Sequence, residues 1–374
     1  MWSNIIGQER VIKILKNIYA SNKISHAYIF YGKEGIGKDA VAIEFAKLIN
    51  CENKINGIEA CDNCTSCRQI NSLNSTTFKF ITALPSGRKE TSESDNPVNT
   101  LKEDDYNIFL EEIEKKSKDN YYKINIQNAN DIKISSIRQI KKEIYLTGIK
   151  GKKKIFLISN CDLMNPQSSN AFLKILEEPP GDSLIILTTA RLNALLATIT
   201  GRCQKIRFDP INKDDLTKFL LNYNNELNTH EAELYADISD GSILKCKNIT
   251  ESYFMELREK MIEMLIALVT NKSITLSNII SEIIADKNKE KIKQFLLLLT
   301  IWFRDVILIS NGEKSNIINK DRLERLEKFS KLYKTNNYRI INYIEDTYKE
   351  LEQNLNTELL LINLAFKIKS EFKT

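Results

Sequence analysis

The chain has 374 residues, which at about 150 residues per domain predicts two or three domains and excludes a single small module. Lys and Arg number 54 against 49 Asp and Glu, and a formal charge of +5 excludes a polycation that binds nucleic acid by bulk charge alone. No stretch reaches the roughly 20 apolar residues of a membrane span, and residues 1–4 show no secretory leader, so we expect no membrane partner and a cytoplasmic location with reduced cysteines.

Short β-rich runs alternate with helical stretches over the first 208 residues, which is the pattern of an α/β fold. The runs that we expect as buried strands are residues 27–31, 78–82, 154–159, 183–189 and 205–208. Such an alternation predicts a parallel sheet with helices on its faces. We therefore expect one α/β domain over residues 1–208.

The first expected strand leads into the loop Gly32-Lys-Glu-Gly35-Ile-Gly37-Lys38, which is followed by an apolar helical run. This is the G-x-x-x-x-G-K phosphate loop in its strand, loop and helix setting. The glycines let backbone N–H groups surround phosphate oxygens, and Lys38 reaches the outer phosphates. Asp39 stands where the motif has a Ser or Thr hydroxyl for Mg²⁺. A carboxylate can ligate the cation but repels a polyphosphate, so binding of ATP with Mg²⁺ stays open.

Four cysteines follow this helix with the spacing C-x9-C-x2-C-x2-C, at Cys51, Cys61, Cys64 and Cys67. Thiolates placed so closely can close a tetrahedral shell around Zn²⁺. Because all four ligands are cysteines, no coordination position stays open, and the module of residues 51–67 is expected to be structural. The three other cysteines are isolated, and we expect them to be small buried apolar groups.

Residues 86–120 form a polar insert that includes Glu90, Glu93 and Asp95. We expect a mobile loop followed by an exposed helix from about residue 101 to 118. The sequence assigns no role or partner to this insert.

The strand expected at residues 154–159 ends in Ser159 and Asn160. A P-loop ATPase presents there an Asp that holds the metal and a Glu that polarises the attacking water. Neither Ser nor Asn ionises usefully at neutral pH, so neither can act as a general base. Asp162 is expected to lie beyond the strand end and out of reach.

The last third of the chain changes character. Residues 209–248 are expected to form a small helical lid. Beyond them the chain has no proline and a single glycine, Gly312, which leaves residues 249–374 free to be helical. Apolar residues recur there at three and four positions in the runs 255–268, 274–284, 292–309 and 338–355. We expect an all-helical C-terminal domain.

Taken together, these features resemble the bacterial clamp-loader branch of the AAA+ superfamily, the subunits of DNA polymerase III that open and load the sliding clamp. The resemblance covers about residues 3–248, and besides the loop and the cysteine module it rests on the runs IGQE (6–9), ISHAYIF (24–30), ISSIRQI (134–140) and NAFLKILEEPP (170–180). It implies an AAA+ P-loop sheet with an inserted zinc module, a helical lid and an all-α collar that holds a hetero-pentameric ring together.

Residues 200–203, Thr-Gly-Arg-Cys, look like the family's Ser-Arg-Cys motif with Gly for Ser. The resemblance implies that Arg202 acts in trans, by neutralising charge on the transferring phosphoryl group in a neighbour's ATP site. It also implies that Thr188 or Thr189 occupies the sensor 1 position. Leu244 stands where active subunits carry the sensor 2 arginine.

The changes are thus concentrated in the chain's own ATP site, whereas the trans-acting arginine and the cysteine module are kept. This pattern resembles the δ′ type of subunit, which donates its arginine to the adjacent ATPase without hydrolysing ATP itself. The implied partners are the other clamp-loader subunits, the sliding clamp and primer–template DNA within the assembled complex.

Two other hypotheses stay open. One is a working ATPase of the γ/τ type that uses Asp39 for Mg²⁺, against which Ser159 and Asn160 count. The other is a zinc-dependent nucleic-acid-binding module on a relict nucleotide fold. The cysteine loop carries only Lys54 and Arg68 as cations and no aromatic side chain, so it lacks the basic and aromatic surface that such a module needs.

Overall fold

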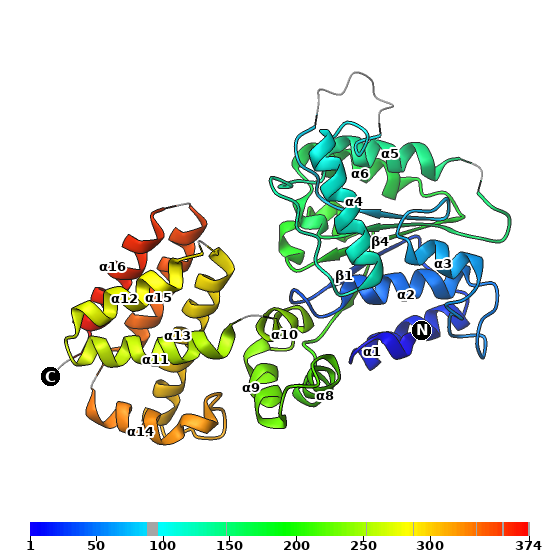
Figure 1. Ribbon diagram of the computed structural model, residues 1–374. Coiled ribbons are helices and arrows are strands. Elements are labelled where there is room, and N and C mark those ends of the chain that lie inside the picture. Colours follow the sequence, from blue (N-terminus) through cyan, green and yellow to red (C-terminus); the bar gives the residue numbers. More distant parts are fainter. Residues whose placement is uncertain are drawn as a thin grey trace. The chain divides into compact units, whose positions relative to one another are not determined.

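The computed structural model describes residues 1–87, 96–146, 148–251, 253–286, 288–333, 335–353 and 355–372 (Figure 1). Its contacts divide the chain into two compact units: Met1–Phe219 with Ser239–Lys245, and Leu220–Ile238 with Cys246–Thr374. The separate lid over residues 209–248 stays a prediction, as do the boundaries that go with it. Residues 88–95, on which part of the expected mobile loop falls, lie outside the described residues.

A five-stranded sheet in the described residues forms the centre of the first unit. Its strands are β1 (Ala27–Tyr31), β2 (Phe78–Ile81), β3 (Lys154–Ile158), β4 (Ser183–Thr189) and β5 (Gln204–Arg207). They lie in the order β2-β3-β4-β1-β5, and every neighbouring pair is parallel. The five expected strands are therefore confirmed, and β4 is buried along its whole length, as a central parallel strand must be.

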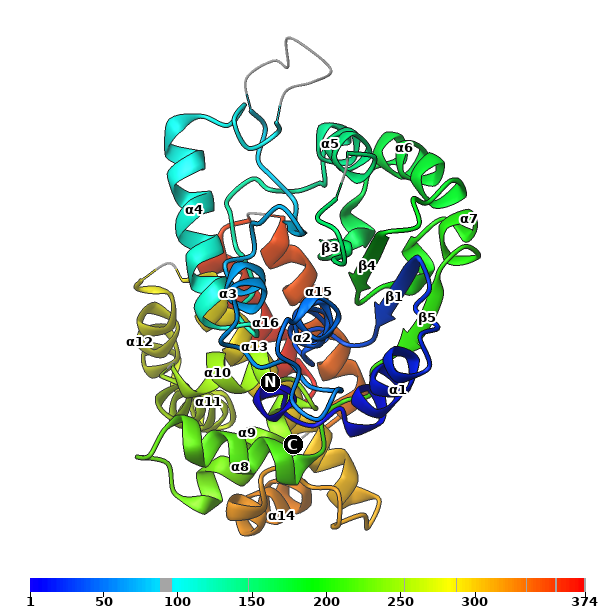
Figure 2. The same cartoon turned by 90° about the vertical axis from the view of Figure 1, so that its right-hand side faces the viewer.

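Helices cover both faces of this sheet (Figure 2). They are α1 (Glu9–Ala20), α2 (Lys38–Asn50) and α3 (Thr65–Asn71) on one face, and α5 (Ile134–Ile144), α6 (Pro166–Glu177) and α7 (Ala197–Thr200) on the other. Successive side chains of β1 alternate between the two cores. Tyr28 and Phe30 enter the core under the first set, whereas Ala27 and Ile29 enter the core under the second.

Local sequence signals explain where α6 begins and ends. The Asn165 side chain accepts a hydrogen bond from the Ser168 N–H at 2.9 Å, and Pro166 occupies the first helical position, where its missing N–H costs nothing. Pro179 and Pro180 follow the helix, and neither can continue it. Short 3-10 turns complete the unit at η1 (Trp2–Asn4), η2 (Cys161–Leu163) and η3 (Leu192–Ala194).

The insert contains the expected helix, α4 (Glu103–Lys118), but the expectation that this helix is exposed was wrong in part. Glu112 is only 5% exposed and Lys116 only 3%. Both charges are buried because they have partners: Glu112 accepts the Asn125 N–H at 2.7 Å, and Lys116 lies 3.3 Å from Asp39. The composition of the insert is polar, yet this helix packs onto the sheet domain.

The chain is helical from residue 213 onward, apart from connecting loops, in the residues that the structure describes. The helices are α8 (Lys213–Tyr223), α9 (Thr229–Ser239), α10 (Ile243–Thr250), α11 (Phe254–Val269), α12 (Ser273–Ile284), α13 (Lys289–Ser310), η4 (Lys320–Arg322), α14 (Leu323–Leu332), α15 (Asn337–Glu352) and α16 (Thr357–Ser370). The all-helical C-terminal region is thus confirmed. No described helix combines the length and apolar character that crossing a bilayer requires.

The second unit has a buried polar network that its apolar periodicity did not predict. Arg258 of α11 is fully buried, and its guanidinium donates to both carboxylate oxygens of Asp321 at 2.7 Å and to Asn319 Oδ1. The Asn319 N–H and Nδ2 in turn donate to the fully buried Asp305 at 2.8 Å. These bonds fix the loop after α13 against α11.

This network predicts an acid-sensitive step in unfolding. Burial raises the pKa of Asp321, but the hydrogen bonds and charge of Arg258 outweigh it, and the pKa lies below its ordinary value. A lowered pKa gives stability that is fully present above the unfolded-state pKa of about 3.9 and is lost as the pH falls through the folded-state pKa. In Asp321→Asn the free energy of unfolding should fall less steeply below about pH 4 than in the wild type, as measured by denaturant unfolding. Equal slopes would contradict this role of the ion pair.

Candidate functional site

The phosphate loop lies at the carboxyl edge of the sheet. The loop follows β1, Ser159 directly follows β3, and Thr188 is near the end of β4. Because parallel strands end at the same edge, these three segments converge on Asp39 in the first turn of α2. Ser159 Oγ donates to Asp39 Oδ2 at 2.8 Å, and Thr188 Oγ1 donates to Asp39 Oδ1 at 2.6 Å. Asp39, Ser159 and Thr188 therefore form one polar cluster.

The three glycines of the loop are required by the protein's own atoms. Gly35 and Gly37 have φ values of +75° and +92°, in the left-handed region that favours glycine. A Cβ at Gly37 would lie 2.8 Å from the Tyr121 ring, and one at Gly35 would lie 2.6 Å from Leu244 Cβ. A Cβ at Gly32 would lie 2.5 Å from the Phe208 carbonyl oxygen. Segments far away in sequence thus occupy the space that the glycines leave free.

Lys38 folds back onto the loop itself. Its Nζ donates to the carbonyl oxygens of Gly32 at 2.9 Å and of Lys33 at 2.5 Å, and the residue is only 8% exposed. Burial lowers the pKa of Lys38, with the charge of Asp39 opposing that shift. The ammonium is already satisfied by the backbone of the loop.

Asp39 receives a cation from the insert. Lys116 Nζ lies 3.3 Å from Asp39 Oδ2 and also donates to the Asn120 and Tyr122 carbonyl oxygens at 2.8 and 2.7 Å. Burial raises the pKa of Asp39, but the charge of Lys116 and the hydroxyls of Thr188 and Ser159 outweigh it, so the pKa lies below its ordinary value. The carboxylate is therefore ionised at neutral pH. Sequence reasoning missed Lys116, because nothing in a polar insert marks one lysine as buried.

Little space remains beside the loop. The cavity bounded by Gly35, Gly37, Lys38, Lys116, Tyr121 and their neighbours has a volume of about 60 Å³. Pockets that enclose small-molecule ligands span roughly 300–1,000 Å³. The cavity is therefore much smaller than a nucleotide needs.

The Asp162 carboxylate forms its hydrogen bonds with residues outside the Asp39 cluster. Its Oδ1 accepts from Thr189 Oγ1 at 2.7 Å, and its Oδ2 accepts from Arg191 Nε at 2.8 Å. Both carboxylate oxygens thus have partners on the segment at and after the end of β4. The hydroxyl that reaches the phosphate-loop cluster is that of Thr188, whereas Thr189 turns to Asp162.

Arg202 lies at the opposite edge of the sheet. It precedes β5, whose first residue, Gln204, pairs with Tyr28 near the start of β1, whereas the phosphate loop follows the end of β1. Its side chain is 39% exposed, donates to the Thr198 carbonyl oxygen at 3.0 Å and forms an ion pair with Glu177 at 2.9 Å. Arg202 therefore lies apart from the predicted site residues of the phosphate loop.

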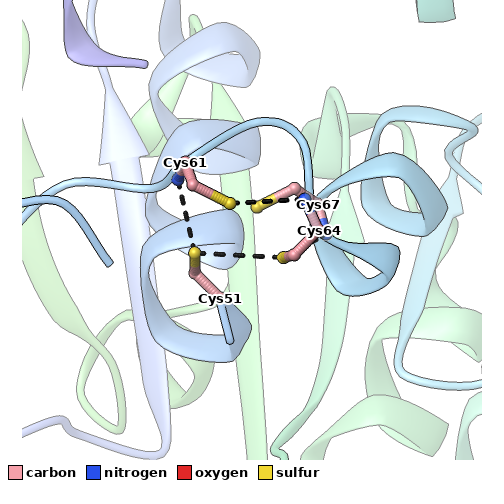
Figure 3. A group of neighbouring side chains, drawn as sticks. All are labelled: Cys51, Cys61, Cys64 and Cys67. Atoms are coloured by element: carbon pink, nitrogen blue, oxygen red, sulfur yellow. Dashed lines mark hydrogen bonds between the residues drawn. The ribbon is translucent and has the colours of Figure 1, made fainter. Parts of the chain in front are cut away.

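The four cysteines of the module form one cluster (Figure 3). Their sulfur atoms all lie within 4.8 Å of one another, and Cys51, Cys64 and Cys67 are buried. Backbone N–H groups point at the sulfurs: that of Cys61 donates to Cys51 Sγ and that of Cys64 to Cys61 Sγ, both at 3.3 Å. No disulfide joins any of the seven cysteines, all of which are among the described residues. The cluster has the ligand number and spacing to hold one metal ion.

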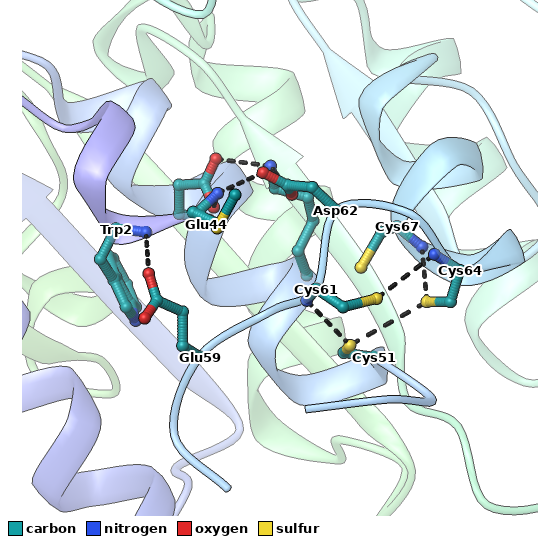
Figure 4. Close-up of polar contacts among 10 residues, drawn as sticks. Trp2, Glu44, Cys51, Glu59, Cys61, Asp62, Cys64 and Cys67 are labelled. Carbon is teal, nitrogen blue, oxygen red and sulfur yellow. Dashed lines mark hydrogen bonds and ion pairs between the residues drawn. The ribbon is translucent and has the colours of Figure 1, made fainter. Parts of the chain in front are cut away.

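Charged side chains attach this module to the sheet domain (Figure 4). Lys47 of α2 is buried between Glu44 and Asp62, with Nζ–O distances of 2.5 and 2.7 Å. Burial lowers the pKa of Lys47, but the two carboxylates outweigh it and raise the pKa above its ordinary value. The Trp2 N–H donates to Glu59 at 3.0 Å. The sequence shows no signal for this network beyond charged residues in an otherwise apolar helix.

Comparison with known proteins gives a consistent result. A family model described as DNA polymerase III, delta subunit, matches residues 7–212, and one described as DNA polymerase III, delta subunit, C terminal, matches residues 252–370. The DNA polymerase III subunit delta' of Bacillus subtilis is 25% identical over 365 residues, which are 96% of this chain and 96% of that relative.

Two further proteins are similar to this chain. One matches over a smaller share of both chains, and the other is a solved structure with a lower sequence identity. The DNA polymerase III subunit gamma of Buchnera aphidicola is 28% identical over 254 residues, which are 67% of this chain and 57% of that relative. A solved structure of a DNA polymerase III gamma-subunit-related protein from Thermotoga maritima is 16% identical, covers 96% of this chain and 99% of its own, and superposes with a TM-score of 0.46.

The buried pair of Lys116 and Asp39 can be tested through stability. Lys116→Met leaves a mostly buried carboxylate without its cation, and breaking a buried pair from one side costs about 3–5 kcal/mol. We expect the free energy of unfolding to fall by about 3 kcal/mol in denaturant titrations. The matched control is Lys118→Met on the same helix, where the ion pair with Glu114 is exposed and contributes little to stability. Equal losses in the two variants would contradict the role given to Lys116.

Proposed function

Since the chain belongs to the DNA polymerase III delta-subunit family and is a δ′-type clamp-loader subunit, we propose that it donates Arg202 to the ATP site of a neighbouring subunit without hydrolysing ATP itself. A guanidinium delivered in trans stabilises the charge on the transferring phosphoryl group. The chain contributes this cation, and the neighbour contributes the nucleotide and the catalytic base.

The position of Arg202 is the observation that carries this proposal. The side chain is partly exposed and lies at the amino edge of the sheet, away from the chain's own phosphate loop at the carboxyl edge. An arginine at that edge has no role in its own loop and is open to another subunit. Glu177 holds the guanidinium by one ion pair, and an exposed pair of this kind is weak enough to exchange for a phosphate.

The chain's own loop supports the absence of hydrolysis. Ser159 and Asn160 follow β3, and neither can take a proton from water at neutral pH. Asp162, the nearest acid after them in sequence, is bound to Thr189 and Arg191. These contacts disfavour the alternative of a working γ/τ-type ATPase.

Membership in the family gives other clamp-loader subunits as partners. We extend this to the sliding clamp and to primer–template DNA within a hetero-pentameric ring, and to a cytoplasmic location, where replication takes place in bacteria. The C-terminal helices are the proposed collar. They leave large apolar side chains exposed, and such surface favours contact with protein neighbours: Ile266, Ile274, Tyr338, Leu359 and Phe366 are more than half exposed.

The alternative of a nucleic-acid-binding zinc module gains no support from the contacts. Lys150, Lys152, Lys153 and Lys154 form the densest basic run of the sheet domain. The last three donate within the protein, to Glu52, to the Gly181 carbonyl oxygen and to the Glu143 carbonyl oxygen. Lys54 of the cysteine loop donates to the Cys51 carbonyl oxygen. These cations serve the fold rather than a basic surface.

For the cysteine cluster we propose a structural Zn²⁺ site. Four thiolates close a tetrahedral shell and leave no open position for catalysis. The cluster is buried next to the Lys47 network, so the metal would fix the module to α2.

Metal analysis tests this assignment. The purified chain should carry about one Zn²⁺, as expected for a closed Cys₄ site, and Cys64→Ser should lose most of it and unfold at lower temperature. Cys246→Ser, at a buried cysteine outside the cluster, should keep its metal. A fully folded wild-type chain without metal, measured by elemental analysis after purification without chelators, would refute the zinc site.

The arginine proposal is tested in the reconstituted clamp loader. In Arg202→Ala, ATP turnover at the adjoining site should fall by about 10³-fold, because an arginine finger is worth at least that much, while assembly is retained. Arg202→Lys should recover little, since Lys lacks the planar fork of donors. The measurements are steady-state ATP hydrolysis and size-exclusion chromatography.

The matched control is Arg207→Ala, another exposed arginine of the same sheet domain, which pairs with Asp209. A clamp loader reconstituted with Arg207→Ala should hydrolyse ATP at the wild-type rate. Unchanged turnover in Arg202→Ala would remove the arginine-finger proposal, whereas loss of assembly would reassign Arg202 to a structural role.

A further inference from the structure

We infer that α4 and the turn after it, residues 119–123, close the chain's own phosphate loop against nucleotide, with the Lys116 ammonium in the place of a divalent cation and the Tyr121 ring in the place of the phosphates. The inference goes beyond the proposed function, which concerns the neighbour's ATP site and requires only that this chain does not hydrolyse ATP. It states that no nucleotide enters, and it assigns a role to α4, the helix of the insert.

The charge argument begins at Asp39. In a working loop the hydroxyl after the lysine and an acid after the adjacent strand hold Mg²⁺ beside the outer phosphates. In this chain Asp39 and Ser159 stand at these two positions. The Ser159 hydroxyl donates a hydrogen bond to the Asp39 carboxylate, and the Thr188 hydroxyl donates to the same carboxylate. Lys116 completes this cluster at 3.3 Å from Asp39. A divalent cation at that point would meet an ammonium already in place.

The steric argument rests on Tyr121. Its ring lies where a Cβ on Gly37 would be only 2.8 Å from Cε1, so the ring is in contact with the glycine whose N–H would face a phosphate. Its hydroxyl accepts the Ile6 N–H at 2.8 Å, which fixes the ring from the other side. A phosphate can reach this part of the loop only if the ring moves away.

The turn that carries Tyr121 is held in several places. Lys116 donates to carbonyl oxygens of the turn at Asn120 and Tyr122, and Glu112 accepts from the Tyr122 hydroxyl at 2.8 Å. Lys123 forms an ion pair with Glu34 of the phosphate loop. The same lysine that neutralises Asp39 therefore also fixes the turn that covers Gly37.

A second wall comes from the start of α10. The Ile243 N–H donates to the Gly35 carbonyl oxygen at 2.9 Å, and Leu244 lies against Gly35. Together with Tyr121 this leaves the cavity of about 60 Å³. The loop is thus filled from two sides by parts of its own unit.

Binding of ATP with Mg²⁺ to the full-length chain, measured by equilibrium dialysis, tests the inference. The dissociation constant of the wild type for ATP with Mg²⁺ should be larger than ~1 mM. The variant Asp39→Thr/Lys116→Met/Tyr121→Ala removes both members of the ion pair together, so no buried charge is left alone, and it also removes the ring. It should bind at least ~10-fold more tightly than the wild type. The matched control Asp39→Thr/Lys116→Met/Tyr121→Phe keeps the ring and should bind no better than the wild type.

A second measurement uses the wild-type chain and does not depend on how the variants fold. In the assembled clamp loader, hydrogen exchange of the amides of residues 32–38 should be the same with and without ATP and Mg²⁺. Wild-type binding tighter than ~1 mM that is lost in Lys38→Ala, or protection of these amides by ATP, would overturn the inference. A folded Tyr121→Ala triple variant that binds no better than its Phe counterpart would overturn it as well. None of these results alters the outcome for Arg202→Ala, so the two proposals fail separately.

Discussion

A mostly buried carboxylate at the start of α2 is the constraint on which the sheet domain depends. Asp39 has a side-chain exposure of 19%, and a charge in such a place is tolerated only with a partner and hydrogen bonds. The carboxyl edge of the sheet supplies two hydroxyls, and the insert supplies the cation. The insert is thereby bound to the core through a charge that a working phosphate loop does not contain.

The sheet could be predicted well because its signals are local. Each strand is a short β-rich run between helical stretches, and the phosphate loop marks the end of β1. The same locality explains why the cysteine cluster and the all-helical region were found. Spacing alone places the four sulfurs near one another, and apolar periodicity alone makes α11 and α13 helices with a buried face.

The parts that could not be predicted are contacts between segments far apart in sequence. Lys116 contacts Asp39 and Tyr121 contacts Gly37 across more than 75 residues, and the insert that carries Lys116 and ends next to Tyr121 is polar enough to indicate exposure. Arg258 is similar, because an arginine in a helix predicts a solvated face unless its partners, Asn319 and Asp321, are known. In each case a charged side chain can be buried because it is paired with a group far away in sequence, and no local sequence pattern indicates that pairing.

The changes in the loop are physically linked to one another. Ser159 Oγ lies 2.8 Å from Asp39, so an aspartate at position 159 would place a second carboxylate beside the first, and like charges that close disfavour joint ionisation. Once position 39 is an acid paired with Lys116, a neutral hydroxyl after β3 is the group that fits. The absence of a metal-binding acid after β3 is therefore consistent with the acid at position 39. The carboxyl edge of the sheet is neutralised by groups of the chain itself, and the amino edge carries the partly exposed Arg202.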